Sequence, residues 1–485
     1  MSVQNQRVTK NVVGTLVTQL LTFGMAFLVN LYLPRYLGPS GTGKVGIIAS
    51  WVMILGVFVT LGTSQVIVKE VARDRSKAGP LLAAGLTLRL LMGLLTIPVA
   101  YLVSWSLGYS QEMRTLLLVS VPGMVVFVLN DVFTTIYQGR EELGRYNRAT
   151  LLDKVAYGIA VFLLVNFKAP LWAIAGVAAL SGLLTFSYYA VGLRDLLKTL
   201  PLPRWEDLKA LTVASLPFMG LLIFRTLYGQ TDPIVLGAVA TEQEAGWYKV
   251  AFQLVGSAMF FPMALIFALL PTLSRLHHQN DRAGFAALAQ KALEVTLLVG
   301  LPISGAAIFL SGPIIRLLYG PSFAGAAPVL AVGGFGMLLY FITAVLGLLV
   351  MAMDRQVVQT RSSVIACLFG IPLCILFSWG GHRLWGNAAL GAILSDVIVE
   401  VYLGIIYWRT LPRDLFNPTL VTRLVRYGLA AIPMLVGLSL SMGSSLGLWG
   451  AVPCAVIYLA GCVLLRCWSP AELKALRGML LRRAV

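Results

Sequence analysis

Long apolar stretches follow one another along almost the whole of this 485-residue chain. About fourteen of them have the roughly 17–25 residues that a helix needs to cross the hydrocarbon core of a bilayer. Charged residues make up only 12% of the chain, against about 25% in ordinary soluble domains. A soluble fold of this size cannot bury so much apolar surface, so lipid is the expected solvent. The expected spans are 11–33, 45–66, 80–106, 115–137, 151–167, 171–193, 210–231, 247–270, 288–310, 325–351, 361–379, 387–408, 421–442 and 447–466.

The apolar runs are continuous, which favours helices over alternating β-barrel strands. We therefore predict an all-α polytopic membrane protein. The net charge of +17 follows the positive-inside rule once the N-terminus is placed inside, because most Lys and Arg near span ends then fall on the inner side. Lys69, Arg73 and Lys77 are examples. We interpret the basic surplus as a topology signal with attraction to anionic membrane lipids and not as a nucleic-acid surface, and we expect both termini to be cytoplasmic.

An internal repeat organises the spans before residue 413. Pro34 to Gly38 follows the first span as Pro233 to Gly237 follows the seventh. Each half contains an even number of spans, about six, which predicts a parallel repeat with a cavity between two lobes at mid-depth. The expected division is an N-lobe over 1–200, a C-lobe over 201–412, two further spans over 413–468 and a basic amphipathic helix on the inner leaflet over 469–485.

Residue patterns for catalysis and metal binding are missing from the sequence. The cysteines lie in or beside spans, no CxxC occurs, and the histidines have no metal-ligand spacing. There is no P-loop for ATP-driven transport. The expected outer loops are short, unlike those of a membrane-embedded polysaccharide polymerase or ligase. We therefore predict a protein that is not an enzyme, with no catalytic residues, no metal site and no cofactor other than a coupling Na⁺ or H⁺.

Short glycine-containing motifs recur in order through both halves. They are Tyr36-Leu-Gly-Pro-Ser-Gly-Thr-Gly-Lys44, Leu61-Gly62 leading to Lys69-Glu-Val-Ala-Arg73, Asp232 through Gly237 with Gly246-Trp-Tyr248, Pro271-Thr-Leu-Ser274, and Leu318-Tyr-Gly320-Pro-Ser-Phe323 with Ala326-Ala327. In these motifs the chain resembles the polysaccharide flippase family. The superfamily of that family also contains multidrug-and-toxin extruders and lipid-linked peptidoglycan precursor flippases. The resemblance covers essentially the whole length.

The resemblance implies a two-lobe, V-shaped transporter of about fourteen helices in the bacterial inner membrane. Such a protein passes an undecaprenyl-diphosphate-linked oligosaccharide from the cytoplasmic to the outer leaflet by alternating access, driven by an ion gradient or the membrane potential. Transporters of this kind usually act as monomers. Two alternatives stay open. One is a multidrug or cation antiporter of the same superfamily, in which carboxylates should dominate the cavity. The other is a lipid-linked peptidoglycan precursor flippase.

Two arginines inside expected spans are the first candidates for binding the substrate. Arg89 lies about 13 Å into its span at 1.5 Å per residue, and Gly85, Gly93 and Thr96 share its face. A central arginine costs about 2.5–3.5 kcal/mol on insertion scales, so it requires a reason to be there. Arg225 occupies the seventh span. Guanidinium groups bind phosphate oxygens through a bidentate fork, which suits a diphosphate. The alternative is that each arginine pairs with a carboxylate on a neighbouring helix.

Three further basic residues lie near the outer ends of spans. Arg35, Lys44 and Lys249 are expected at the rim of the cavity, where they could also bind the substrate. The alternative for these three residues is that they are solvated loop charges.

Four acidic residues inside or beside spans are the candidates for ion coupling. They are Asp396, Glu400, Asp232 and Asp131. The first two are one turn apart on one helix face, and two such carboxylates cannot both ionise cheaply in a low dielectric. One should hold a proton, or both should share a cation. The alternative is a salt bridge to Arg225 or Arg361.

Overall fold

The computed structural model describes residues 3–441 and 447–468. Every regular element in these two ranges is an α-helix or a 3-10 helix, which confirms the predicted all-α class. The amphipathic helix expected over 469–485 lies outside the described residues. The chain divides into two compact units, Met1–Gly246 and Trp247–Val485, which we call the first and the second unit.

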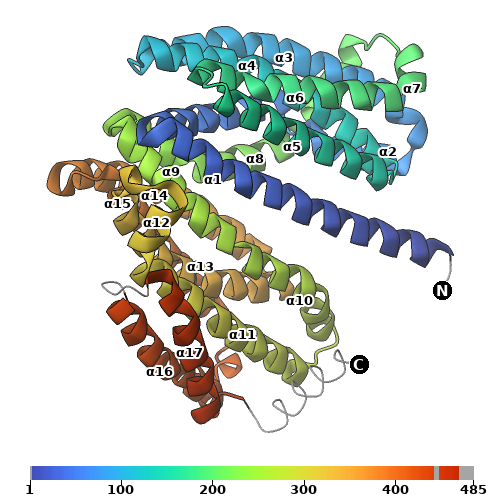
Figure 1. The fold of residues 1–485 in the computed structure, drawn as a ribbon. Helices are drawn as coiled ribbons and strands as arrows, with labels where there is room; N and C mark the ends of the chain where they lie inside the picture. Colours follow the sequence, from blue (N-terminus) through green and yellow to red (C-terminus); the bar gives the residue numbers. More distant parts are fainter. Residues whose placement is uncertain (1–2, 442–446, 469–485) are drawn as a thin grey trace, which may run out of the picture. The chain divides into compact units, whose positions relative to one another are not determined.

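The first unit is a bundle arranged around one central helix. Its helices are α1 (Val3–Thr60), α2 (Thr63–Arg73), α3 (Ala78–Ser106), α4 (Gln111–Gly139), α5 (Leu143–Asn166), α6 (Leu171–Gly192), α7 (Arg194–Lys198), α8 (Trp205–Val239) and the first turn of α9 (Glu242–Ala258). The central helix is α4, which packs against α1, α2, α3 and α6 (Figure 1). Helix α5 packs against α1 and α6 and completes the bundle.

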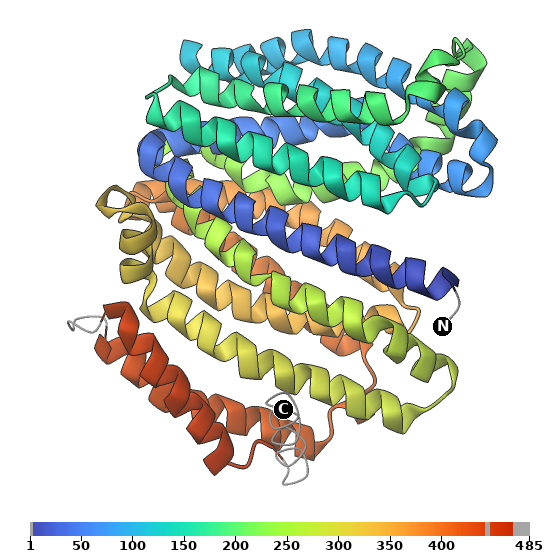
Figure 2. The same ribbon diagram turned by 45° about the vertical axis from the view of Figure 1, so that its right-hand side comes forward.

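The first two expected spans are the two arms of α1. The arms meet at Gly38, whose φ of 68° and ψ of 178° are not helical. Glycine tolerates a positive φ without steric cost, and the following Pro39 has no backbone N–H to continue the helical hydrogen bonds. Figure 2 shows the long first arm, which begins at the N-terminus, and the bend at its far end.

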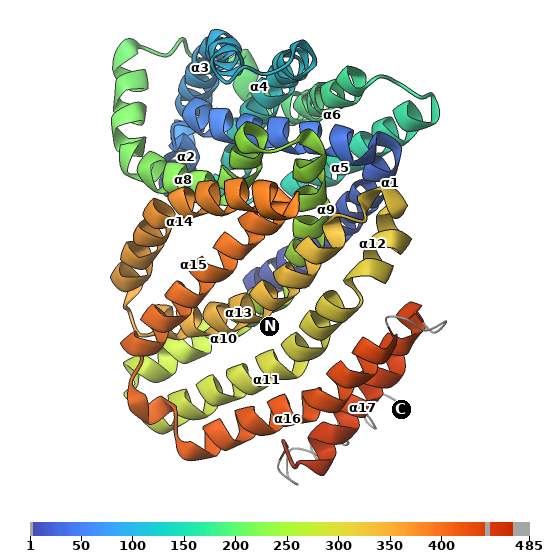
Figure 3. The ribbon, with the colours of Figure 1, turned by 90° about the vertical axis from the view of Figure 1, so that its left-hand side faces the viewer.

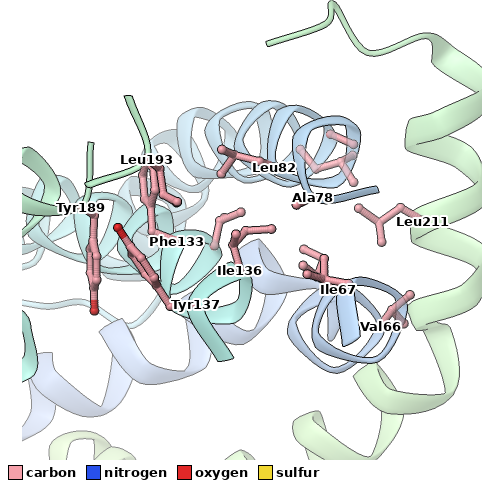
Figure 4. Close-up of a cluster of buried hydrophobic side chains, with 14 of the residues drawn as sticks. Val66, Ile67, Ala78, Leu82, Phe133, Ile136, Tyr137, Tyr189, Leu193 and Leu211 are labelled. Atoms are coloured by element: carbon pink, nitrogen blue, oxygen red, sulfur yellow. The ribbon is translucent and has the colours of Figure 1, made fainter. Parts of the chain in front are cut away.

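A buried apolar cluster fixes α2 against its neighbours. The cluster joins side chains of α2, α3, α4 and α6 with the beginning of α8 (Figure 4). Ile67 of α2, Leu82 of α3 and Phe133 of α4 are all fully buried in it. Burial of such side chains stabilises a fold by about 25 cal/mol per Å² of apolar surface. The cluster therefore holds in place the helix whose first turn carries Thr63 and Ser64.

The second unit is also arranged around one helix, α13. Its helices after α9 are α10 (Phe260–His278), α11 (Arg282–Phe309), α12 (Ser311–Tyr319), α13 (Ala326–Ala352), α14 (Gln356–Trp385), α15 (Ala388–Thr410), α16 (Pro418–Ser441) and α17 (Ala451–Leu464). Helix α13 contacts α10, α11 and α15, and α14 packs along α15. The pair α16–α17 lies beside α11 (Figure 3). An ion pair of 2.9 Å between buried Glu294 of α11 and Arg423 of α16 joins these helices.

The membrane-spanning character expected from the sequence is present in these helices. Among the described residues, 11 helices are long and apolar enough to cross a membrane, or 12 with α8, which bends by 43° between Gly220 and Leu222. This number is two lower than the expected number of about fourteen spans, for two local reasons. Helix α1 counts once but carries one expected span on each side of its bend, and the apolar helix α17 has only 14 residues, fewer than a span needs.

The structure starts one helix earlier than expected, and its two compact units meet at a different residue from the expected lobe boundary. Helix α5 begins at Leu143, earlier than the expected start at 151, because its first two turns are polar and helical but not apolar. The expected lobe boundary lies at residue 200, whereas the division by contacts falls after Gly246. Helix α8 accounts for this difference, since it packs against α1, α2 and α3.

Candidate functional site

Arg89 on α3 forms the centre of a buried polar network in the first unit. The residue is 0% exposed. Its Nη1 lies 2.9 Å from Asp131 Oδ2 and donates a 2.6 Å hydrogen bond to the Val128 carbonyl. Its Nη2 donates to Ser64 Oγ at 2.8 Å and to Thr63 Oγ1 at 3.2 Å, and the Ser64 hydroxyl donates to Asp131 Oδ2 at 2.6 Å. The guanidinium that we expected to bind phosphate is thus bound to protein groups and closed to solvent in this structure.

Glycines bring these groups together. Gly62 has a φ of 70° and separates α1 from α2, so Thr63 and Ser64 begin a new helix that faces α3. A Cβ at Gly85 would lie 2.9 Å from a valine side chain of α4, and one at Gly93 would lie 3.0 Å from another. Helices α3 and α4 therefore approach closely along the small residues on the face of Arg89. This approach places the guanidinium of α3 against the carboxylate of α4.

A cavity of about 640 Å³ lies within the first unit between α1, α4, α5 and α6. Polar side chains at its wall include Asn130, Asp131, Thr134, Asp153, Lys154 and Tyr189. The Asp131 side chain is 34% exposed, so the carboxylate that neutralises Arg89 also reaches this cavity. Lys154 Nζ lies 3.1 Å from Asp153 Oδ2, which neutralises the one lysine on the wall. A role of Asp131 in ion coupling stays a prediction.

Lys44 lies after the bend of α1 and is held by two carboxylates. Its Nζ is 2.6 Å from Glu112 Oε2 and 3.4 Å from Glu242 Oε2. Ser40 Oγ donates a 2.8 Å hydrogen bond to the same oxygen of Glu242. Both acids stand in the first turns of their helices, where the helix dipole favours negative charge. The charge of Lys44 is therefore already neutralised in the first unit.

The carboxylates of α15 have separate partners in the second unit. Asp396 and Glu400 are both half-buried. The Tyr248 hydroxyl of α9 lies 3.5 Å from Asp396 Oδ2, and Thr343 Oγ1 of α13 lies 2.6 Å from Glu400 Oε2. No ion pair involves Glu400 within residues 3–441 and 447–468, so the structure contains no salt bridge between Glu400 and Arg361. Within those same ranges, no group of three or more His, Cys, Asp and Glu side chains could hold a metal ion.

The remaining candidates are spread over both units. Arg35 is exposed on α1, and Asp232 is half-buried on α8 in the first unit. Lys249 is half-buried on α9 in the second unit. In the part of the chain that the structure describes, Lys249 has no ion pair. Arg225 lies within α8, but its side chain is outside what the structure describes.

Sequence reasoning missed the hydroxyl partners of the buried charges. Ser64 bridges Arg89 and Asp131, and Thr343 binds Glu400. Ser64 had a local signal, because a hydroxyl two residues after Gly62 stands at the beginning of a helix. Thr343 had none, since a threonine in an apolar helix usually bonds the carbonyl of its own preceding turn.

Solved structures with a similar fold identify the fold of this protein. The fold resembles that of the lipid II flippase MurJ in an inward closed conformation, with a TM-score of 0.69 at 17% identity over 94% of this chain and 99% of that chain. It also resembles an inward-facing multidrug resistance MATE family transporter of the MOP superfamily, with a TM-score of 0.64 at 16% identity over 84% of this chain and 99% of that chain. The chain therefore has the fold of the MOP-superfamily transporters.

Sequence comparison then assigns the family. The family model described as polysaccharide biosynthesis protein matches residues 8–277, and that of the lipid II flippase MurJ matches residues 248–460. Because the first match covers more than half of the chain, the protein belongs to the polysaccharide biosynthesis protein family.

Two curated relatives cover most of the chain. The probable low-salt glycan biosynthesis flippase Agl15 of Haloferax volcanii is 19% identical over 387 residues, which are 78% of this chain and 80% of the relative. The succinoglycan biosynthesis transport protein ExoT of Rhizobium meliloti is 22% identical over 413 residues, which are 82% of this chain and 77% of the relative.

Proposed function

We propose that this protein moves an undecaprenyl-diphosphate-linked oligosaccharide from the cytoplasmic to the outer leaflet of a bacterial plasma membrane. It works by alternating access, as a monomer with both termini cytoplasmic, and an ion gradient or the membrane potential drives it. The family, the transporter fold and the names of two relatives, a glycan biosynthesis flippase and a succinoglycan biosynthesis transport protein, support this proposal. It involves no covalent chemistry.

An anionic headgroup needs a cation inside the membrane, and the structure shows which candidate basic side chains are already neutralised by carboxylates. Arg89 is neutralised by Asp131, and Lys44 by two glutamates. Lys249 lies within a membrane-spanning helix and has no ion pair among the described residues. A lysine within a span is costly unless an anion or water compensates its charge. The diphosphate of the cargo is the anion that fits this requirement, and this observation on Lys249 carries the proposal.

Neutralising Lys249 tests the proposal directly. Lys249→Gln should lower flipping of a fluorescent lipid-linked oligosaccharide in proteoliposomes at least tenfold, because an ammonium–phosphate contact contributes more than about 1.4 kcal/mol in a low dielectric. Lys249→Arg should retain most of the activity. The matched control is Lys291→Gln, because the partner of Lys291, Glu294, keeps Arg423 as a second cation. Flipping by Lys249→Gln at the wild-type rate, at equal protein levels, would contradict the binding role.

A lipid-linked peptidoglycan precursor is a second candidate cargo. The match of the lipid II flippase model to residues 248–460 favours it, because that segment contains most of the second unit. Both cargoes share the polyprenyl diphosphate and differ in the sugar. Expression in cells depleted of their own peptidoglycan precursor flippase distinguishes them. Rescue of growth would support the second candidate, and loss of surface polysaccharide on deletion of this protein, without rescue, would support the first.

A further inference from the structure

Glu400 lies in a membrane-spanning helix, and among the described residues it forms no ion pair with any cation. On α13 the one titratable side chain is that of Tyr340. On α14 the titratable side chains are those of Arg361, Cys367, Cys374, His382 and Arg383. Gly370 of α14 packs against Val399, the residue before Glu400. Arg361 lies nine residues before Gly370, which is about 13 Å toward the N-terminal end of α14. The cations of α14 are thus at its ends, away from Glu400.

The titratable groups on α15 and α9 are acids, phenols, one lysine and one arginine. On α15 the titratable side chains are those of Asp396, Glu400, Tyr402, Tyr407 and Arg409. Helix α9 approaches α15 through Tyr248, which bonds Asp396, and carries Glu242, Glu244 and Lys249 as its other titratable groups. Glu400 forms an ion pair with none of them within the described ranges. An ionised Glu400 would be an uncompensated charge at membrane depth, which costs several kcal/mol.

The hydrogen bonds of Thr343 show how the carboxyl group avoids this cost. Thr343 Oγ1 lies 2.6 Å from Glu400 Oε2 and 3.0 Å from the Tyr340 carbonyl. A hydroxyl has one proton and two lone pairs, so as the donor to both oxygens it would share that proton in a weaker three-centre bond. A protonated carboxyl group that donates to Thr343, which then donates to the Tyr340 carbonyl, gives each of the two contacts a proton of its own.

We propose that Glu400 is the proton carrier that couples this transporter to a proton gradient. In the conformation described here, the protonated carboxyl group donates to Thr343 Oγ1. When the site opens to the side of lower proton concentration, the O–H bond of Glu400 breaks and the proton passes to water. The inference rests on the proposed function and names its coupling ion. A sodium ion fits less well, because it needs several oxygen ligands, and the hydroxyl that bonds Glu400 among the described residues, that of Thr343, already bonds a carbonyl.

Infrared spectroscopy of the purified protein tests the protonation without any cargo. In lipid at pH 7, the carbonyl stretch of a protonated carboxylic acid should be present and shift in D₂O. Glu400→Gln should remove it, and Glu294→Gln, whose partners are Arg423 and Lys291, should leave it in place. Thr343→Val should move the band to higher frequency because its hydrogen bond is lost, and Thr343→Ser should restore it. A spectrum of Glu400→Gln that keeps the band, or a band that Thr343→Val does not move, would overturn the proposal.

Transport in proteoliposomes then tests the coupling. A pH gradient should accelerate flipping by the wild type and have no effect on Glu400→Gln, which is fixed in the neutral form. Acceleration by a sodium gradient alone would overturn proton coupling but leave the flippase function intact. A protein that shows the Glu400 band but flips no lipid-linked oligosaccharide would instead refute the proposed function.

Discussion

A fully buried arginine in a lipid-embedded bundle is stable only while a carboxylate neutralises it. Arg89 and Asp131 form such a pair, and Ser64 bonds both of them. Arg89→Ala should destabilise the protein by about 3–5 kcal/mol, because Asp131 would lose its cation. Asp131→Ala should lower the free energy of unfolding by a similar amount, because the buried Arg89 would lose its carboxylate partner. The double variant should cost clearly less than the sum, since it leaves no uncompensated charge. Thermal unfolding in detergent measures all three.

The control for this cycle is a pair at the surface. Arg73 lies 3.5 Å from Glu70 and is 65% exposed, so Arg73→Ala should hardly move the unfolding temperature. Additive losses for Arg89→Ala and Asp131→Ala would show that the two charges do not depend on each other. The stabilising role of the pair would then be wrong.

For these individual residues, the sequence predicted which charges lie inside the membrane but not which side chains they contact. Arg89, Asp131 and Glu400 could be identified as charges inside apolar segments. Helical periodicity gives the face that each residue occupies, but it does not say which neighbouring helix meets that face. The pairing of Arg89 depends on the close approach of α3 to α4 and on the helix break at Gly62, which are properties of packing.

Among the elements, α1 and α9 approach each other through glycine. A Cβ at Gly246 would overlap the backbone carbonyl of Pro39, beside the bend of α1. Because the obstacle is backbone and not a flexible side chain, Gly246→Ala must displace one helix. We expect a clear fall in the thermal unfolding temperature and in the yield of folded protein, consistent with overpacking costs of about 1–3 kcal/mol. Size-exclusion chromatography and thermal unfolding measure both effects.

The same helix offers a matched control. Gly256 lies ten residues further along α9, and a Cβ there would meet nothing within 4 Å. Gly256→Ala should be neutral or stabilising by up to about 1 kcal/mol, because alanine favours helix over glycine. Equal effects of Gly246→Ala and Gly256→Ala would contradict the close contact at Pro39.

The elements themselves were more predictable than their boundaries. Apolar length predicted the membrane-spanning helices, because hydropathy measures what the bilayer selects. It did not predict that α5 begins at Leu143, since the first turns of α5 are polar. It did separate the two arms of α1, which the structure divides at Gly38.

For the whole molecule, the distribution of charge predicts the orientation in the membrane. By the positive-inside rule, we expect the loop before α4 to lie outside and the loop between α10 and α11 to lie inside. Gln111 at the start of α4 and Gln279 just after α10 are both exposed. The native cysteines are all buried, so single cysteines introduced at these positions can be labelled selectively. Gln111→Cys should react with an impermeant maleimide on intact spheroplasts, whereas Gln279→Cys should react only after permeabilisation. The unmodified protein is the control for background labelling. The reverse pattern would place both termini outside and would require a transport direction opposite to the proposed one.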